Sequence, residues 1–543
     1  MLIAGLATVL VLGVAPFADR VDAYPRQPLD VEHYSFALQL SDSTDRIAGE
    51  ATVRIRVLPP GLSTVVLDLA TTTAERQGRG MRVNSVRRSG RELVFAHAAD
   101  RLTITLDSAG KAGDVIELVV RYAGVPADGL QIGPNKYGER GFFSDNWPDK
   151  ARQWLPLIDH ISDKATMDMD VVAPAHYQVI SNGRRVEHTD LPGGQRRTSW
   201  RESVPIAPWL YVLGVAHFAV QQLGDFQGVP LETWVFAQDR EAGFADFASP
   251  SREVLAFYSA FVGPYAYEKL ANVQSNSVSG GMEAASAIFY SSQSVTGTRS
   301  IRWRNVVIHE IAHQWFGNAV TESDWNDVWL SEGFATYFTL LFIEHAYGRD
   351  EFVAGLRDSR KTVLSADDKT PGYRVVHANL TDMSQVTSAM TYQKGSFILH
   401  MLRQEMGDDR FWLGIREYYA RFRNGSATTT DFRQVMERAA GRSFAPFFEQ
   451  WLYRGGIPRL EGTWHWDRTA GQVIVELRQT QAGEPFMIPV EFGIVETAGP
   501  SRVVQGELKG RDGTFTFAAP VEPASVEPDP NVRLLASWTL ARK

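Results

Sequence analysis

The 543-residue chain contains no cysteine, so disulfides are excluded and any metal site has to be built without thiolate ligands. It also has no Lys/Arg-rich run, and its formal net charge is -8. Nucleic acids are normally bound by a basic face, so the composition argues against a nucleic-acid partner. Internal repeats and low-complexity segments are missing as well, which argues against a solenoid. The length instead indicates about three globular domains.

The first 23 residues have the pattern of a signal peptide. An apolar run over residues 2–17 ends in the small-residue pattern Val21-Asp22-Ala23, which resembles a cleavage site. The run is too short to span a membrane comfortably, and no Lys or Arg precedes it, which is atypical for a leader. We therefore expect an exported protein, periplasmic or extracellular, whose mature chain has no stable membrane span.

The rest of the chain changes character twice. Residues 24–222 show strand patterns, such as the alternating ATVRIRV at 51–57. Residues 223–455 contain long patterns with apolar residues three and four apart, which indicate helices. After Gly455-Gly456 the pattern returns to strands over 456–543. The sequence predicts a β domain, a mostly helical domain and a second β domain.

One of the helical patterns carries the sequence HEIAHQWFGN from His309. Residues four apart lie on one face of a helix, so His309 and His313 can bring two imidazole nitrogens to a zinc ion about 2.1 Å away. Glu310 lies beside the first ligand and can reach a water on the metal without binding the metal itself. Two histidines on a buried helix also occur without any metal, so this motif alone is suggestive only.

A third ligand is indicated nineteen residues after His313, in the sequence WLSEGFATYF at 329–338. Ser331 is placed to cap a second helix, and Glu332 is the one carboxylate on its apolar side. Burying a lone carboxylate is costly, and a metal partner removes that cost. We therefore expect one zinc per chain, held by His309, His313 and Glu332 with a fourth position open.

This spacing resembles the zinc signature of the M1 (gluzincin) aminopeptidases. The sequence DVWLSEGFATYF at 327–338 resembles the third-ligand helix of that family, GGMEA at 280–284 its G-x-M-E-N exopeptidase motif, and YQKG at 392–395 the segment with its catalytic tyrosine. Residues 151–166 and 261–274 are also similar to the family. The resemblance covers nearly the whole chain after the leader.

The resemblance implies a multi-domain α+β fold. The expected domains are an N-terminal β-sandwich or saddle (24–222), a thermolysin-like, mostly helical zinc peptidase domain (223–455) and a short C-terminal β-sandwich (456–543). A long helical C-terminal domain, common in the family, is not expected, and the cleft should therefore be more open.

The resemblance also implies a role for each site residue. Glu310 would be the general base acting on a zinc-activated water, and Tyr392 would stabilise the oxyanion of the tetrahedral intermediate. Glu283 would bind the free α-amine of a peptide substrate. The substrate-binding segment implied by the family motif is Gly280, Gly281, Met282 and Glu283. The implied activity is hydrolysis of the N-terminal peptide bond by an M1-type metallo-aminopeptidase.

Two departures from the family pattern affect this expectation. Ala284 stands where the family usually has asparagine, so a contact to the peptide backbone is lost. The polar residue that helps to anchor the amine in many members falls near Trp147 here, where Asp145 or Asn146 could substitute.

Three other functions remain open. A zinc endopeptidase of broader specificity would share the histidines and Glu310 but would have no use for Glu283, which would then be a turn carboxylate. A non-catalytic binding scaffold is disfavoured, because the metal ligands, Glu310 and Tyr392 are all intact. Epoxide hydrolysis also occurs in the superfamily, but nothing in the sequence singles it out.

Overall fold

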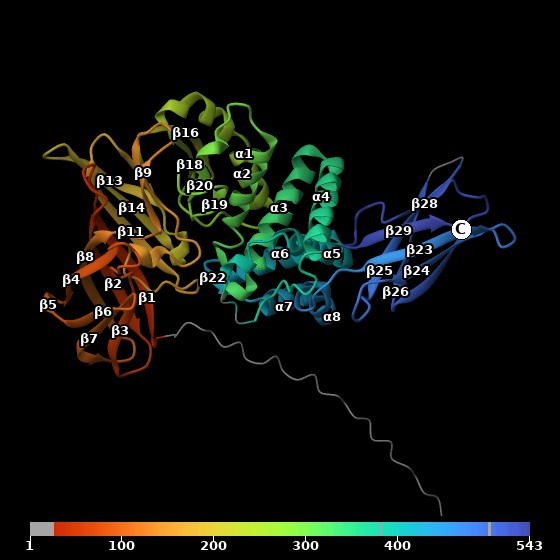
Figure 1. Cartoon of the computed structure of the whole chain (residues 1–543), viewed down its shortest axis with the longest axis horizontal. Coiled ribbons are helices and arrows are strands. Elements are labelled where there is room, and N and C mark those ends of the chain that lie inside the picture. Colours follow the sequence, from red (N-terminus) through yellow and green to blue (C-terminus); the bar gives the residue numbers. More distant parts are fainter. Residues whose placement is uncertain (1–26, 379, 381, 498–500) are drawn as a thin grey trace, which may run out of the picture.

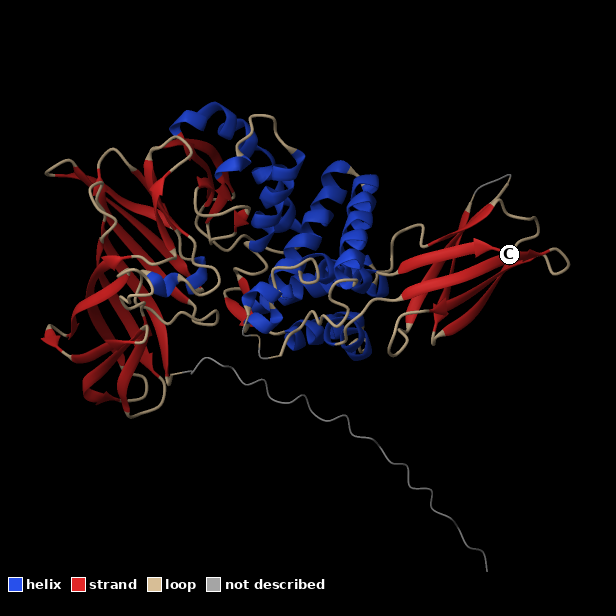
Figure 2. Cartoon of the chain, in the orientation of Figure 1, coloured by secondary structure: helices blue, strands red, loops and turns tan. Residues whose placement is uncertain are grey.

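The computed structural model describes residues 27–378, 380, 382–497 and 501–543, so the predicted signal peptide at 1–23 lies outside the described residues. The described chain is elongated, with sheets at one end, helices in the middle and a second set of sheets at the other end (Figure 1). The same division is clear when the elements are coloured by type (Figure 2).

The N-terminal part is built on an eight-stranded sheet in the order β13-β14-β11-β1-β2-β8-β4-β5. The β1–β11 pair is parallel, and the other pairs are antiparallel. In β2, Val53, Ile55 and Val57 are buried and Arg54 is exposed, as the alternation predicts. The strands are β1 (Leu29–Gln39), β2 (Ile47–Val57), β4 (Gly80–Arg88), β5 (Arg91–Glu92), β8 (Val115–Val125), β11 (Ala165–Pro174), β13 (Arg184–Leu191) and β14 (Gln195–Ile206).

Two smaller sheets complete this part. A three-stranded sheet has the order β3-β7-β6, and a four-stranded sheet the order β12-β15-β10-β9. Their strands are β3 (Leu62–Asp68), β6 (Val94–Ala98), β7 (Arg101–Gly110), β9 (Leu130–Pro134), β10 (Arg140–Ser144), β12 (Gln178–Ser181) and β15 (Leu213–Ala216).

The central part joins a five-stranded sheet, β16-β17-β18-β20-β19, to a group of helices. The first strand of this sheet, β16, includes residue 222, so the predicted boundary between residues 222 and 223 falls inside a strand. The sheet contains β16 (Phe218–Phe226), β17 (Val229–Phe236), β18 (Leu270–Ser275), β19 (Gly281–Met282) and β20 (Ala287–Ser291).

The helices supply most of the core around the site. Helix α3 is buried along nearly its whole length, from Trp329 to Ile343, because it packs against α2, α4 and α5. A short parallel pair, β21 (Val320–Glu322) and β22 (Gly425–Ala427), lies beside it. The helices are α1 (Arg240–Phe261), α2 (Ile301–His313), α3 (Trp329–Tyr347), α4 (Arg349–Asp367), α5 (Tyr392–Met406), α6 (Asp408–Phe422), α7 (Thr429–Ala440) and α8 (Ala445–Phe448). No described helix is both long and apolar enough to cross a membrane.

The C-terminal part consists of two sheets, β27-β24-β23-β29 and β26-β25-β28. Its described residues, from Arg459 onward, form strands and loops and no helix. The strands are β23 (Arg459–Asp467), β24 (Gln472–Gln479), β25 (Ile488–Val495), β26 (Arg502–Leu508), β27 (Asp512–Ala518), β28 (Ser525–Pro528) and β29 (Ser537–Arg542). The expected α+β fold, with sheets on both sides of a helical centre, is confirmed.

Candidate metal centre and substrate cavity

Helix α2 carries both histidines on its last turn. Val307, Ile308 and Ile311 bury the helix in the core, and His309 and His313 point to one place on its other side. Their Nε2 atoms are 3.0 Å apart, and the two ring planes meet at 84°. This geometry is the expected consequence of the four-residue spacing.

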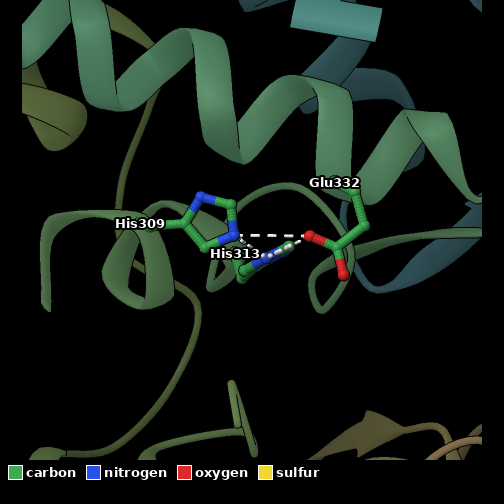
Figure 3. Close-up of side chains that lie close together, drawn as sticks. All are labelled: His309, His313 and Glu332. Carbon is green, nitrogen blue, oxygen red and sulfur yellow. Dashed lines mark hydrogen bonds and ion pairs between the residues drawn. The ribbon is translucent and has the colours of Figure 1, made fainter. Parts of the chain in front are cut away.

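Helix α3 brings Glu332 to the same place (Figure 3). Glu332 Oε2 lies 3.3 Å from the Nε2 atom of His309 and 3.3 Å from that of His313. Ligands about 2.0–2.1 Å from a tetrahedral zinc ion are separated by roughly 3.3 Å, so the three atoms have the spacing that zinc requires. Two imidazole nitrogens and a carboxylate oxygen are also a donor set that zinc accepts. The residues fit the metal.

The other ring nitrogen of His313, Nδ1, has two hydrogen-bond partners, one of them on α3. Ser331 Oγ lies 3.0 Å from His313 Nδ1, and the carbonyl oxygen of Phe316 lies 3.1 Å from it. The predicted role of Ser331 as a helix cap is wrong, because α3 begins two residues earlier, at Trp329. A 3-10 turn capped by Asp324 precedes α3 and moves the helix start upstream. Ser331 instead helps to orient an imidazole, as outer contacts of metal ligands commonly do.

The site is buried and rich in acidic groups. Burial disfavours a charge on His313, but the carboxylates of Glu283 and Glu332 outweigh it and raise the pKa of His313 to about 10. Burial raises the pKa of Glu310 well above its usual range, and the charge of Glu283 adds to this effect. Burial acts in the same direction on Glu332, but His313 and His309 outweigh it and lower the pKa of Glu332. These buried carboxylates are stabilised by positive charge at the position between the histidines, where a divalent cation would lie.

A second possible metal set shares one of these histidines. Glu283, Glu310 and His313 also place one ligand atom each within 4.8 Å of one another. Glu283 Oε1, however, is 3.7 Å from His313 Nε2, farther than the spacing in the set that contains Glu332. The set of His309, His313 and Glu332 is therefore the better zinc site.

Tyr392, the first residue of α5, borders the metal site. Its hydroxyl group donates to Glu332 Oε1 at 2.6 Å, and its ring stacks on that of His309 with centroids 6.1 Å apart. Helices α3 and α5 approach closely because Gly333 and Gly395 face each other; a Cβ on Gly333 would lie 3.0 Å from the Gly395 backbone. The close approach of the helices brings the phenol hydroxyl group to the metal ligand.

The segment predicted to bind substrate runs along the other side of the site. Gly281 and Met282 form β19, which pairs with β20. A Cβ on Gly281 would lie 2.1 Å from Glu310 Oε1, so only glycine lets the backbone pass this close to the predicted base. Glu283 follows, and its carboxylate faces His313 at 3.7 Å. The structure therefore places all nine predicted site residues around one cavity. Ala284, the departure from the family motif, is buried and is not among the described residues lining that cavity.

Two site residues were not anticipated from the sequence. Gln314 and Asn318, both fully buried, donate to the main-chain carbonyl of Glu283 at 2.9 and 2.6 Å. Gln314 Oε1 also accepts the main-chain N–H of Ser286 at 2.9 Å. We call these two carboxamides the Glu283 clamp. The signal that could have found them is their position, since they are polar residues in an otherwise apolar run directly after the second histidine.

The N-terminal part bonds to Ala285 and Ser286, the residues that follow the substrate-binding segment. Asn182 Nδ2 donates to the Ala285 carbonyl at 2.7 Å, and the Gly183 N–H donates to Ser286 Oγ at 2.7 Å. Ser286 has a φ of 64°, a left-handed conformation that is uncommon for serine. Residues 283–286 are thus held between the turn that precedes β13 and the residues that follow α2.

The predicted metal ligands, Glu310, Tyr392 and the segment 280–283 all line one cavity of about 520 Å³. Asp145 lines it, whereas Asn146 accepts from Trp154 Nε1 at 2.9 Å and donates to the Tyr211 carbonyl at 2.6 Å. Of the two predicted alternatives near Trp147, only Asp145 faces the cavity. The lining residues are Asp145, Trp147, Ser277, Val278, Ser279, Gly280, Gly281, Met282, Glu283, His309, Glu310, His313, Glu332, Thr387 and Tyr392.

Family models match most of the chain. The model of the peptidase family M1 domain matches residues 247–451, and that of the peptidase M1 N-terminal domain matches residues 30–210. Glutamyl aminopeptidase of Mus musculus is 24% identical over 490 residues, which cover 85% of this chain and 50% of the relative. The chain spans 34% to 52% of the length of the curated relatives it matches.

Solved structures agree with these matches. A mutant M1 zinc metallopeptidase from Deinococcus radiodurans, bound to the substrate Tyr-Ser-Ala, superposes with a TM-score of 0.68 at 26% identity. The match covers 78% of this chain and 94% of that one. Legionella pneumophila aminopeptidase A in complex with aspartic acid has a TM-score of 0.81, covering 96% of this chain and 60% of that one. At 18% identity, this second likeness shows the fold alone.

Proposed function

The chain belongs to peptidase family M1, and we propose that it is a zinc-dependent aminopeptidase that removes the first residue from peptides with a free amino terminus. The observation that carries this proposal is the joint geometry of the site. A three-ligand set with the spacing of tetrahedral zinc lies in the same cavity as a buried carboxylate, Glu283, that does not belong to this set.

Zinc held by His309, His313 and Glu332 would act as a Lewis acid: it would polarise the scissile carbonyl and lower the pKa of a bound water. Glu310 lies against Gly281 at the edge of this position, and we assign it as the general base. It takes a proton from the attacking water and delivers it to the nitrogen of the leaving amine. Burial raises the proton affinity of Glu310, which suits a group that has to accept and then release a proton.

Tyr392 is assigned to the oxyanion. Its hydroxyl group is next to the ligand Glu332, on α5, and its only task in the reaction is to donate a hydrogen bond to the oxygen that becomes negative. Helix α5 fixes its position, because the close contact of α5 with α3 leaves little freedom between the phenol and the metal ligand.

Glu283 is assigned to the α-ammonium group of the substrate. A buried carboxylate that accepts a charge-assisted hydrogen bond from an ammonium group is stabilised, whereas a mid-chain peptide leaves it unpaired. Asp145 lines the same cavity and adds a second negative charge near the amine. This arrangement favours an aminopeptidase over the endopeptidase alternative, for which a buried Glu283 would only be a cost.

The relatives support peptides as the substrate class. The matched relatives include glutamyl aminopeptidases, and the Deinococcus radiodurans structure holds the peptide Tyr-Ser-Ala. We further propose that residues 1–23 direct export and that the three domains are 24–222, 223–455 and 456–543, with β16 continuing across the first boundary. One zinc per chain and no nucleic-acid partner belong to the same proposal.

The test compares two substrates that differ only at the amino terminus. The zinc-loaded protein is given a leucine arylamide with a free amine and its N-acetylated form. We expect cleavage of the free-amine substrate, loss of cleavage with a chelator, recovery with zinc, and much slower cleavage of the acetylated form. Equal cleavage of both would favour the endopeptidase, and activity that survives the chelator would exclude the zinc mechanism.

A further inference from the structure

We propose that the substrate cavity selects against an acidic first residue and that Asp145 sets this preference. The inference rests on the proposed aminopeptidase function and adds the class of side chain that the enzyme accepts. It predicts neutral and basic first residues as substrates, in contrast to what the names of the glutamyl aminopeptidase relatives suggest.

Outside the metal site with its two histidines, the charged side chains that line the cavity are all acidic. Four carboxylates line it, those of Asp145, Glu283, Glu310 and Glu332, and no lysine or arginine is among the described lining residues. An acidic first side chain would therefore have no basic side chain to bind in the cavity. Like charges that are brought together without compensation oppose binding.

Three of the four carboxylates have a positive partner during the reaction. Glu332 is a metal ligand, Glu283 faces the α-ammonium group, and Glu310 takes up a proton. Asp145 can share only the single α-ammonium charge that already faces Glu283, so one negative charge remains in excess in the cavity and acts on the first side chain of the substrate.

One lysine lies close to Asp145, but it lies outside the cavity lining. Lys150 Nζ is 3.7 Å from Asp145 Oδ2 and 3.5 Å from Asp128 Oδ2, so its single charge is shared by two carboxylates. Lys150 therefore does not reverse the sign of the charge that the substrate meets.

The remaining walls near Asp145 suit an uncharged or long side chain. Trp147, Val278 and Met282 line the cavity, and the ring of Trp147 packs edge-on against Trp325, with centroids 5.8 Å apart. Apolar side chains can bury surface here, and the methylene stem of a lysine or arginine can do the same while its charge faces Asp145.

The decisive experiment uses glutamine and glutamate as the first residue, because the two side chains have nearly the same shape and differ in charge. For the zinc-loaded protein we expect kcat/KM to be at least tenfold higher for glutamine arylamide than for glutamate arylamide. Binding is measured separately on the inactive Glu310→Gln variant by calorimetry, where Gln-Ser-Ala should bind at least tenfold more tightly than Glu-Ser-Ala. Equal or better use of the glutamate substrate would overturn the inference.

Asp145 is tested by a matched pair of variants. Asp145→Asn should lower the glutamine-to-glutamate ratio at least threefold. Asp128→Asn, which removes the other partner of Lys150 and lies outside the cavity lining, should leave the ratio unchanged. An unchanged ratio in Asp145→Asn, with the wild-type preference intact, would overturn the role of Asp145.

A gain-of-charge variant keeps the test informative if Asp145→Asn does not fold. Val278→Lys adds a cation to the lining and should also lower the ratio, while Val278→Gln, of similar length, should not. If the ratio stays the same in Val278→Lys, the lining charge does not set the preference. Failure of the proposed function is distinct from all these outcomes, since the protein would then cleave none of the arylamides, including those of leucine and glutamine.

Discussion

The Glu283 clamp allows a quantitative test of how the substrate segment is held. Among the described residues, Asn318 Nδ2 donates only to the Glu283 carbonyl, and Asn318 Oδ1 has no hydrogen-bond partner. Asn318→Ala therefore removes one hydrogen bond, and the carbonyl keeps its bond from Gln314. The expected loss of unfolding free energy is about 1 kcal/mol, the net value of a typical hydrogen bond.

Gln314→Met should cost more, because it changes both ends of the carboxamide. The variant loses the donor to Glu283 and also leaves the buried N–H of Ser286 without its acceptor at 2.9 Å. An orphaned buried donor costs roughly 1–3 kcal/mol, so the total is expected at roughly 2–4 kcal/mol. In the double variant the Glu283 carbonyl loses both partners, and the loss should exceed the sum of the single losses by about 1 kcal/mol or more.

The assay is urea unfolding of the three variants beside the wild type, with zinc content and kcat/KM for free and acetylated arylamides measured on the same samples. Neither carboxamide belongs to the metal set, so zinc content should stay at one per chain. The preference for the free amine should fall, since the backbone of Glu283 is less well held. Strictly additive losses, or an unchanged preference for the free amine, would refute the view that the two carboxamides position Glu283 together.

Three further outcomes are expected. His309→Ala should lose both zinc and activity, whereas Glu310→Gln should keep the zinc and lose most of its turnover; loss of zinc in Glu310→Gln would contradict its role as a base. Tyr392→Phe should lower kcat by a factor of about 10²–10³, as removal of one oxyanion donor typically does, and a change confined to KM would contradict this role. Burial raises the pKa of Asp163 to about 8, well above its unfolded value, even though Tyr34 donates to it at 2.9 Å. The stability linked to Asp163 is therefore complete below about pH 4, is lost progressively as the pH rises toward 8, and changes no further above that pH. Asp163→Asn should therefore flatten the fall in the unfolding midpoint between pH 4 and pH 8; an equally steep fall in the variant would contradict this.

The metal set could be predicted from sequence because it depends on local geometry. The spacing of His309 and His313 fixes their relation on any helix, and Glu332 was identified because it is an isolated carboxylate on an apolar helix face. The helix start was predicted incorrectly at Ser331, since the preceding 3-10 turn with its Asp324 cap leads into α3 without a break. A capping residue type predicts a helix end only when the preceding residues do not continue the turn.

The other site features depend on tertiary contacts that no spacing reveals. Gln314 and Asn318 bond to a main-chain carbonyl more than thirty residues away, which any residue type could supply. Asp145 and Asn146 are neighbours of similar size, and only the packing of Trp154 and Tyr211 around the asparagine shows which of them faces the cavity.

The hydrogen bonds from Asn182 and Gly183 make the substrate side of the site depend on a contact between two parts of the fold. Asn182 and Gly183 lie in the N-terminal part, just before β13, whereas the metal set lies on α2 and α3 of the central part. A change at this contact is therefore expected to act on the residues around Glu283 and to leave the spacing of the metal set as it is.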